Sequence, residues 1–485
     1  MKKIAYILIA MTFVVGPSVF GNPLASRAQA AEEPENVELI SLGKAIFFDS
    51  SLSVTGLQSC ASCHDPVAAF TGPDSDVNDS LAVYEGAIAT RYGNRKPPTS
   101  AYCGESPVLY YNPDYDVNLG ITSWIGGMFW DGRATGWSLG DPLAEQAMGP
   151  FLNPLEQAMP NAKLVCLRVA HSDYAGLFEA VWGPGSLDFV KDVEGTYERI
   201  VRSVAAYERS AESSPYTSKF DLFWANAKAA GKNPSNIRAN GIPMGMGPGG
   251  GGGGGNAQNN PIRWEHYRNL GLTDDELKGL AVFNDPNRGN CASCHTLTEG
   301  SAGYPLFTDF SYHNLGIPRN PENPFYFMPQ KWNPDGINWV DPGLGGFLKA
   351  AGYSAEIYSV EMGKFKTPTV RNVDFRPDPG FVKSYGHNGF FKSLDGMDGI
   401  VHFYAWRATM DSGMGGGGGM GGGGMGGGGM GGGGMGDGQT PNPNMFPEPE
   451  LDENRIMMQP FMFPTDGVKI ITFLKTLSDG YIETP

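Results

Sequence analysis

The pentapeptide CASCH occurs twice in this 485-residue sequence, at residues 60–64 and at residues 291–295. In a C-x-x-C-H motif the two thiols are spaced to add to the two vinyl groups of a haem, and the adjacent histidine can then ligate the iron. A zinc site would need further cysteine or histidine nearby, but the next histidine after His64 is His171. A C-x-x-C redox pair would not explain the histidine that follows both pairs. The sequence therefore predicts two covalent haems, the first held by Cys60, Cys63 and His64 and the second by Cys291, Cys294 and His295.

The side of each iron opposite its histidine decides between two roles. A pure electron carrier keeps both irons six-coordinate, whereas an oxidoreductase leaves one axial position open to substrate. No histidine lies between His64 and His171, and the methionines that could replace one, Met128 and Met148, fit packing roles better. We therefore expect an open first haem, which is typical of an enzyme.

The chain is acidic, because 35 Lys and Arg stand against 51 Asp and Glu, a formal net charge of −16. Such a surface disfavours nucleic acid and anionic membranes as partners. It suits a basic protein partner, such as many small electron carriers, although it also serves solubility alone.

The N-terminus has the pattern of a secretory signal peptide over residues 1–30. Two lysines precede an apolar run at residues 4–20, and an A-x-A cleavage site ends at Ala30. A membrane anchor is the alternative, but the apolar run is short and contains Gly16 and Pro17. No later stretch is long and apolar enough to cross a bilayer. We expect an exported, periplasmic protein with no membrane span in its mature chain.

Two cysteines remain outside the haem motifs, Cys103 and Cys166. In an oxidising compartment they could form a disulfide, provided that their Cα atoms lie close enough. A disulfide and two buried thiols both stay open at this point.

Helical patterns and loops alternate along the chain, without a sustained run of alternating strand residues, which predicts an all-α protein. Apolar residues recur at helical spacing over residues 39–48, 193–212, 274–283 and 463–477. Thr273 and Glu276 form a capping-box pattern at the start of the third segment. Long stretches rich in Gly, Pro and Asn, such as residues 314–341, need something large to pack against, and a haem would serve.

Two Gly-rich segments cannot form a core. Residues 243–255 indicate a flexible linker, and we place the first haem domain at 31–237, the linker at 238–261 and the second haem domain at 262–485. Residues 413–436 repeat a Met followed by four Gly. Thioether binding of a soft metal such as Cu(I) is one interpretation. A disordered insertion is the better one, because Gly-rich chain has no preformed geometry.

Blocks across nearly the whole mature chain resemble the bacterial di-haem cytochrome c peroxidase family, including its methylamine-utilisation (MauG) branch. In the first half the blocks are LGKAIFFD at 42–49, AFT at 69–71, FWDGR at 129–133, EQAMGP at 145–150 and residues 153–156. In the second half they are residues 272–295, KTPTVRN at 366–372, HNG at 387–389, residues 401–404 and FLKTL at 473–477. The resemblance implies two cytochrome c-like haem domains with long irregular loops.

The resemblance also implies roles for single residues. Trp130 matches a tryptophan between the two haems, where an oxidisable indole can relay an electron. Glu156 matches the distal acid-base of the peroxide-binding haem, because one carboxylate above the iron can move a proton between the two peroxide oxygens. Gln146 matches a hydrogen-bonding residue of the same pocket, and Pro150 matches a neighbour of small profile.

The second haem's distal ligand is a methionine or a tyrosine in the family, on the helix after HNG. The block that ends at Tyr404 fits the tyrosine type best. Met397 lies seven residues earlier and shares the helix face of Tyr404, whereas His402 points about 200° away from it. We favour Tyr404 over Met397, His402 and Met362. The choice matters because a phenolate stabilises ferric iron, while a thioether favours a ferrous store.

Two departures from the family change the expectations. No histidine follows the first motif where some relatives carry a removable distal ligand, so we expect a first haem that needs no priming electron. An asparagine that helps hold calcium between the haems would fall near Lys96, and lysine cannot ligate calcium. Asn94 could substitute for it, so calcium stays open as a bound ion.

The resemblance favours one activity over two alternatives. It implies reduction of hydrogen peroxide, with electrons from a small donor protein such as a cytochrome c or a cupredoxin entering through the second haem. The second hypothesis is a MauG-like oxidase that modifies a side chain of another protein. The third is a non-enzymatic electron carrier with two six-coordinate haems.

Overall fold

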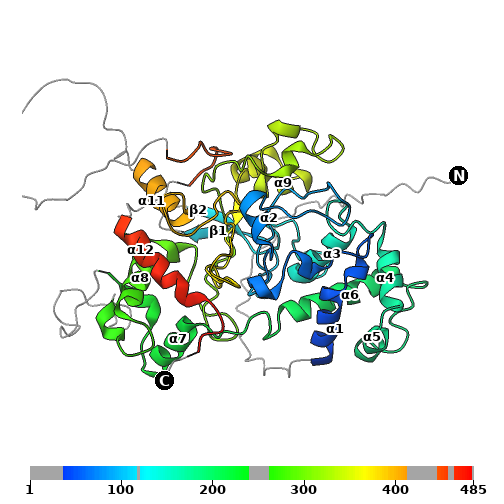
Figure 1. Cartoon of the computed structure of the whole chain (residues 1–485), viewed down its shortest axis with the longest axis horizontal. Helices are drawn as coiled ribbons and strands as arrows, with labels where there is room; N and C mark the ends of the chain where they lie inside the picture. The colour runs from blue at the N-terminus through cyan, green and yellow to red at the C-terminus, as the bar shows by residue number, and fades with distance from the viewer. Residues whose placement is uncertain (1–36, 117–120, 240–261, 412–444, 457–463, 483–485) are drawn as a thin grey trace, which may run out of the picture. The chain divides into compact units, whose positions relative to one another are not determined.

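The computed structural model describes residues 37–116, 121–239, 262–411, 445–456 and 464–482 (Figure 1). The predicted signal peptide, most of the predicted linker and the Met-Gly repeat lie outside these residues. Within them, no helix combines the length and the apolar character that crossing a bilayer requires. The domain boundaries stay a prediction.

In the N-terminal half, two helices far apart in the sequence pack against each other. They are α1 (Val37–Phe48) and α6 (Val193–Glu208). Their crossing is closest at Gly43, where a Cβ atom would lie 1.8 Å from the Ser203 carbonyl oxygen, so only glycine fits there. Three further helices lie near them in Figure 1 and add residues to the same apolar core: α3 (Pro142–Leu152), α4 (Ala162–Ala170) and α5 (Ala175–Trp182).

The C-terminal half contains a similar pair. Helix α8 (Asp274–Asn284) precedes the second motif and packs against α12 (Pro464–Leu474). A Cβ atom on Gly279 would lie 2.2 Å from the Lys469 carbonyl oxygen. Both helices contribute to a second apolar core together with α7 (Lys219–Ala229) and α11 (Ile400–Asp411). Each half thus pairs two helices through a glycine.

Strands are few and short among the described residues. β1 (Tyr110–Asp116) and β2 (Ile121–Ile125) form an antiparallel hairpin in which Tyr111 lies opposite Trp124. The other elements are the parallel pair β3 (Ile237–Arg238) and β4 (Ile262–Arg263), the antiparallel pair β5 (Tyr312–His313) and β6 (Phe365–Lys366), and the helices α2 (Ser75–Ser80), α9 (Gly343–Ala350) and α10 (Ala355–Tyr358). The fold is therefore mainly helical and irregular, with small sheets that the helical pattern did not predict.

The four predicted helices are present, with differences at their ends. Helix α6 ends at Glu208 rather than at residue 212, because the chain turns at residues 209–214. The capping box at α8 is confirmed: the Glu276 amide donates to Thr273 Oγ1, and the Thr273 amide donates to the Glu276 carboxylate.

The two cysteines outside the motifs are free thiols and both are buried. The Cys103 thiol donates to the Ser100 carbonyl at 2.7 Å, and the Cys166 thiol lies 3.8 Å from the Val193 carbonyl. Of the two alternatives left open by the sequence, the structure has the buried thiols.

Candidate haem-binding sites

The first motif forms a short 3-10 helix, Cys60–Ser62, followed directly by His64. The His64 amide donates to the Cys60 carbonyl at 3.0 Å. The His64 Nδ1 atom lies 3.3 Å from the Phe70 carbonyl oxygen, and donation of its proton there leaves the Nε2 lone pair for a metal. Burial lowers the pKa of His64 to about 4, so the ring is neutral, as an iron ligand must be.

The second motif has the same local structure. Cys291–Ser293 is again a 3-10 helix, and the His295 amide donates to the Cys291 carbonyl at 2.9 Å. The His295 Nδ1 atom lies 3.1 Å from the Phe307 carbonyl oxygen, and burial lowers the pKa of this ring as well.

A KPPT segment at residues 96–99 supports the first histidine. Thr99 Oγ1 donates to the Ala69 carbonyl at 2.8 Å, and Thr71 Oγ1 donates to the Pro97 carbonyl at 2.9 Å. These two bonds hold the segment against the loop that carries Phe70. The Pro98 carbonyl then reaches the His64 ring as a second acceptor, which partly opposes the fall in its pKa.

The KTPT segment at residues 366–369 supports the second histidine in the same way. Thr369 Oγ1 donates to the Leu306 carbonyl at 2.6 Å, and Thr308 Oγ1 donates to the Thr367 carbonyl at 2.7 Å. The Pro368 carbonyl is the second acceptor for the His295 ring. The two sites therefore share the same arrangement of supporting hydrogen bonds.

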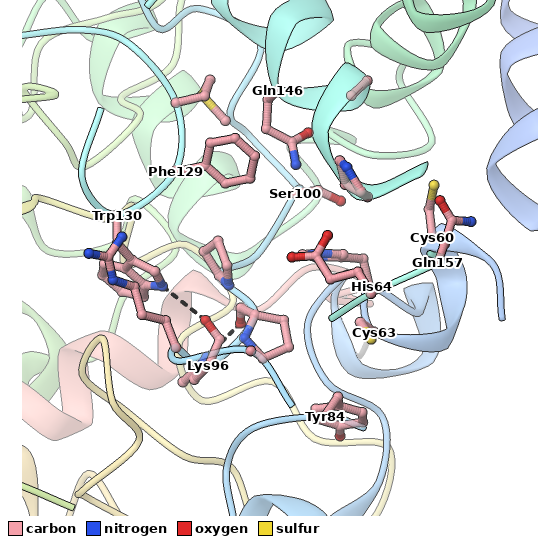
Figure 2. Close-up of a pocket in the computed structure, with 18 of the residues that line it drawn as sticks. Cys60, Cys63, His64, Tyr84, Lys96, Ser100, Phe129, Trp130, Gln146 and Gln157 are labelled. Carbon is pink, nitrogen blue, oxygen red and sulfur yellow. Dashed lines mark hydrogen bonds between the residues drawn. The ribbon is translucent and has the colours of Figure 1, made fainter. Parts of the chain in front are cut away.

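A cavity of about 1220 Å³, part of it open to solvent, borders the first motif (Figure 2). Its wall includes Cys60, Cys63 and His64, together with Gln58 and Gln157. The Oε1 atoms of both glutamines are buried without a hydrogen-bond partner, as expected of polar atoms that a bound group completes. These residues fit a c-type haem.

Helix α3 forms one wall of this cavity. Asp141 caps the helix by accepting hydrogen bonds from the amides of Leu143 and Ala144. Positions 143, 146, 147 and 150 follow helical spacing, so they share one face, and all four line the cavity. Gln146 and Pro150 thus lie on the pocket to which the resemblance assigned them.

Glu156 lines the same cavity, in the turn that follows α3. Its amide donates to the Asn153 carbonyl at 3.0 Å, and its carbonyl accepts from the Ala87 amide at 2.8 Å, so its backbone is held from both sides. Burial raises the pKa of the Glu156 carboxyl above its ordinary value, and the Arg133 guanidinium opposes this rise. The carboxyl therefore holds a proton more readily than an exposed glutamate would.

Trp130 lies on the cavity wall and is fixed by both halves of the chain. Its indole Nε1 donates to the Lys96 carbonyl at 2.9 Å, as Figure 2 shows. Its own carbonyl accepts from the Lys366 amide, also at 2.9 Å. Lys96 and Lys366 are the first residues of the two segments that support the haem-site histidines. Trp130 is therefore bonded to equivalent positions of both sites.

Tyr404 of helix α11 lies beside the second motif. Burial raises the pKa of its phenol, and the nearby thiols of Cys294 and Cys291 raise it further. The competing candidates point elsewhere: Met397 is 63% exposed, and the His402 Nε2 atom lies 3.3 Å from the Met445 sulfur. Of these three side chains, Tyr404 is the one placed near the second site.

A polar cluster lies beside the second motif and was not predicted from the sequence. Tyr115 of β1 donates to Asp309 at 2.5 Å, and Ser311 Oγ lies 2.8 Å from His313 Nε2. The Tyr115 phenol also lies close to the Cys294 thiol. No spacing pattern links residue 115 to residues 309–313, because a bridge between Ile125 and Ser311 is what brings the hairpin to this segment.

Comparisons with known proteins agree with these two sites. The family described as di-haem cytochrome c peroxidase matches residues 37–229. The methylamine utilization protein MauG of Paracoccus denitrificans (strain Pd 1222) is 32% identical over 374 residues, which cover 77% of this chain and 76% of MauG. The cytochrome c551 peroxidase of Nitrosomonas europaea is 28% identical over 369 residues, which cover 75% of this chain and 73% of the peroxidase.

A solved structure shows the same fold. The diheme peroxidase BthA from Burkholderia thailandensis E264 superposes with a TM-score of 0.59 and 23% identity, over 93% of this chain and 88% of BthA. The identity to MauG extends over three quarters of both chains, far beyond the haem motifs themselves. The chain therefore belongs to the di-haem cytochrome c peroxidase family, whose members include MauG, and it is an oxidoreductase of the two-haem c type.

Proposed function

We propose that this enzyme reduces hydrogen peroxide to water at the first haem site, with electrons that a small redox protein delivers at the second. The lining of the first cavity carries this proposal. Among the described residues that line it, His64 is the sole histidine, and the sulfur of Met128 lies 3.8 Å from the Lys366 ammonium group. The absence of a second histidine among these lining residues supports a first haem on which one position would be open to a small substrate.

The residues around this open position suit proton transfer to peroxide. When bound, the haem supplies the redox chemistry of oxygen–oxygen bond cleavage. Each peroxide takes up two electrons and two protons and yields two water molecules. Glu156 would take the proton from one oxygen and deliver it to the other, and the Gln146 amide would orient the substrate by a hydrogen bond.

Electrons would pass from the second site to the first through Trp130. In this proposal the chain forms two cytochrome c-like domains, residues 31–237 and 262–485, and Tyr404 is the second axial ligand opposite His295. The bonds of Trp130 to the Lys96 carbonyl and the Lys366 amide support a place between the sites. A phenolate ligand would favour the ferric state of the second iron.

The donor would be a small basic cytochrome c or cupredoxin of the periplasm. The net charge of −16 supports such a partner, and the signal-peptide pattern of residues 1–30 supports export. The first site would need no priming electron, because no histidine follows its motif until His171.

Electron paramagnetic resonance of the oxidised holoprotein tests this proposal. We expect one high-spin and one low-spin ferric signal, with cyanide converting only the first, and we expect peroxide to oxidise a reduced cytochrome c or cupredoxin at two electrons per peroxide. Two low-spin signals in a protein inert to cyanide and peroxide would instead identify an electron carrier.

A MauG-like oxidase is the second candidate. The position of Tyr404 and the 32% identity to MauG favour it. In that case peroxide would give a long-lived oxidised enzyme that consumes reduced donor slowly and oxidises a side chain of a partner protein. Rapid, stoichiometric oxidation of the reduced donor excludes this candidate.

The Tyr404→Phe variant tests the second ligand directly. Loss of the phenol is expected to shift or abolish the low-spin signal and to leave the high-spin signal unchanged, since Tyr404 lies beside Cys291 and Cys294. Met397→Leu is the matched control, because Met397 is largely exposed. An unchanged low-spin signal in Tyr404→Phe, or a changed one in the control, would remove Tyr404 from the iron.

A further inference from the structure

Lys96, whose carbonyl accepts from the Trp130 indole, stands where the family resemblance implies an asparagine that helps hold calcium, and a second lysine, Lys383, lies near it. The Lys383 residue is buried, and its ammonium donates to the carbonyl oxygens of Asn372 at 2.7 Å and Phe375 at 3.3 Å. The Lys96 ammonium donates to the Pro97 carbonyl at 3.0 Å. Backbone carbonyls are ligands that calcium uses, and here they bind ammonium groups.

These lysines lie close enough together to influence one another. Burial and, to a smaller extent, the neighbouring Lys96 lower the pKa of Lys383 to about 7. Burial likewise lowers the pKa of Lys96 to about 8, with Lys392 as its charged neighbour. The Lys392 ammonium is itself bonded to the Asn78 carbonyl at 2.8 Å. A divalent cation placed among these groups would meet repulsion from each of them.

Two backbone oxygens at and near Lys96 are already hydrogen-bonded. The Lys96 carbonyl accepts from the Trp130 indole, and the Asn94 carbonyl accepts from the Asn323 side chain at 2.9 Å. Calcium takes six to eight oxygen ligands, usually with carboxylates among them. Among the described residues, no group of three or more Asp, Glu, His or Cys side chains is arranged to hold a metal ion.

We infer that the ammonium groups of Lys96 and Lys383 take the place of calcium between the two haem sites, and that the holoenzyme binds no calcium there. The Lys383 ammonium ties its own segment to the carbonyls of Asn372 and Phe375, and the Lys96 ammonium also bonds to the Thr71 hydroxyl at 3.3 Å. The Trp130 indole is held by the carbonyl of one of the same two residues. Its position therefore does not depend on a metal ion.

Metal analysis of the holoenzyme tests this inference independently of peroxide turnover. The purified protein, dialysed against a calcium-selective chelator and then against excess calcium, is expected to retain a small fraction of one calcium per chain. Its Tm and its haem absorption spectrum should be the same with calcium as with chelator. One tightly bound calcium per chain, or a Tm that rises by several degrees on adding calcium, would overturn the inference.

A lysine variant tests the structural role. Lys383→Ala leaves the Asn372 and Phe375 carbonyls without their donor, so its Tm should fall by about 3 °C or more. Lys191→Ala is the matched control, because the Lys191 side chain is 84% exposed and pairs only with neighbouring Asp188 on the surface. Equal Tm values for the two variants would show that the Lys383 ammonium does not hold these loops, and the inference would fail even if peroxide reduction were established.

Discussion

Glu156→Gln is expected to leave the absorption and resonance spectra of both haems intact and to lower peroxide turnover by about 10²–10⁴-fold. Glutamine has the shape of glutamate and can still hydrogen-bond, but it cannot take up and release a proton at neutral pH. The backbone of residue 156 is fixed by the Asn153 carbonyl and the Ala87 amide, so the substitution should not move the chain. The measurement is steady-state oxidation of a reduced donor by peroxide.

The matched control for this prediction is Glu85→Gln. Glu85 lines the same cavity, but its carboxylate accepts from the Thr90 amide and the Tyr92 hydroxyl, and a glutamine oxygen can accept both bonds. Turnover in this variant should stay within about twofold of the native value, because the Glu85 side chain is exposed and the substitution keeps both of its hydrogen bonds. Native turnover in Glu156→Gln would exclude the carboxyl from the reaction.

The pH dependence of the native enzyme should agree with the same role. Burial raises the pKa of Glu156, and the proton-accepting form is the carboxylate. Activity should therefore fall as the pH drops through this raised pKa, and rise to its plateau above it. Glu156→Gln has no such group, so the acidic limb of kcat/KM should disappear from its residual activity.

The haem motifs could be read from the sequence because their chemistry is local. Covalent attachment needs two thiols and a histidine within five residues, and the structure adds only the orientation of each ring. The support for these rings was also present in the sequence, as KPPT at 96–99 and KTPT at 366–369. Each of these segments bonds to a Phe-Thr dipeptide of its own half, Phe70-Thr71 or Phe307-Thr308. The number of residues between segment and dipeptide differs in the two halves, so the pairing could not be predicted from spacing.

The second axial ligand could not be settled from spacing. Tyr404 and Met397 share one helix face only if the helix extends over both, and α11 begins at residue 400. Met397 therefore lies before the helix, in a loop, and is exposed. Contacts of the chain around residues 393–400 set the start of this helix, and no local sequence pattern predicts them.

The Asn-rich stretch 314–341 was expected to need a haem for its order. The structure adds a second contribution, because buried asparagine side chains of this stretch bond to the backbone. Asn323 donates to the Asn94 carbonyl, and Asn333 donates to the carbonyls of Phe325 and Gly336. These bonds satisfy backbone oxygens that would otherwise be buried without a partner. Such pairings join positions far apart in the chain, so composition alone does not reveal them.

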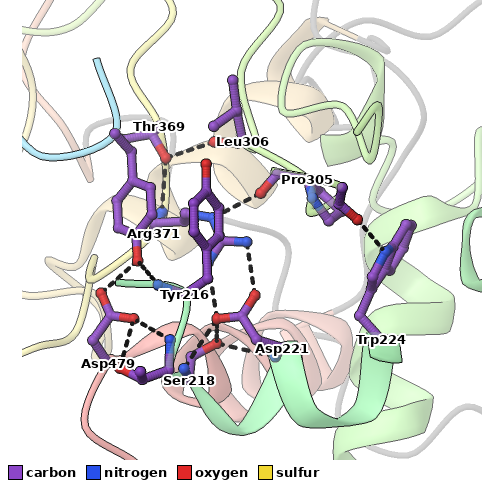
Figure 3. Close-up of polar contacts among 12 residues, drawn as sticks. Tyr216, Ser218, Asp221, Trp224, Pro305, Leu306, Thr369, Arg371 and Asp479 are labelled. Atoms are coloured by element: carbon purple, nitrogen blue, oxygen red, sulfur yellow. Dashed lines mark hydrogen bonds and ion pairs between the residues drawn. The ribbon is translucent and has the colours of Figure 1, made fainter. Parts of the chain in front are cut away.

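Arg371→Met is expected to lower the free energy of unfolding by about 3–5 kcal/mol, the cost of leaving a buried charge without its partner. Arg371 is buried and forms two bonds to the Asp221 carboxylate, at 2.8 and 3.1 Å, as Figure 3 shows. Its Nε donates to the Pro305 carbonyl at 2.7 Å. Urea unfolding of the holoprotein, followed by circular dichroism, measures the change.

Arg268→Met provides the comparison for this loss. Arg268 also pairs with an aspartate, Asp274, but both side chains are nearly half exposed, so its removal should lower the free energy of unfolding far less than Arg371→Met does. Asp221→Asn should lower the free energy of unfolding less in the Arg371→Met variant than in the native protein. The reason is that the double variant leaves no unpaired buried charge. Equal losses for the buried and exposed arginines would contradict the assignment.

Arg371 also contacts residues outside its ion pair with Asp221, so its removal should affect more than that pair. Its guanidinium lies 4.7 Å from the ring centres of both Tyr102 and Tyr216, and Tyr102 donates to Asp479 near the C-terminus at 2.7 Å. The same arginine lies two residues after the KTPT segment that supports His295. A variant without it should therefore lose stability and broaden the low-spin haem signal together, whereas Arg268→Met should change neither. If Arg371→Met lost stability while its low-spin haem signal stayed unchanged, the ion pair would stabilise the fold without positioning the second haem site.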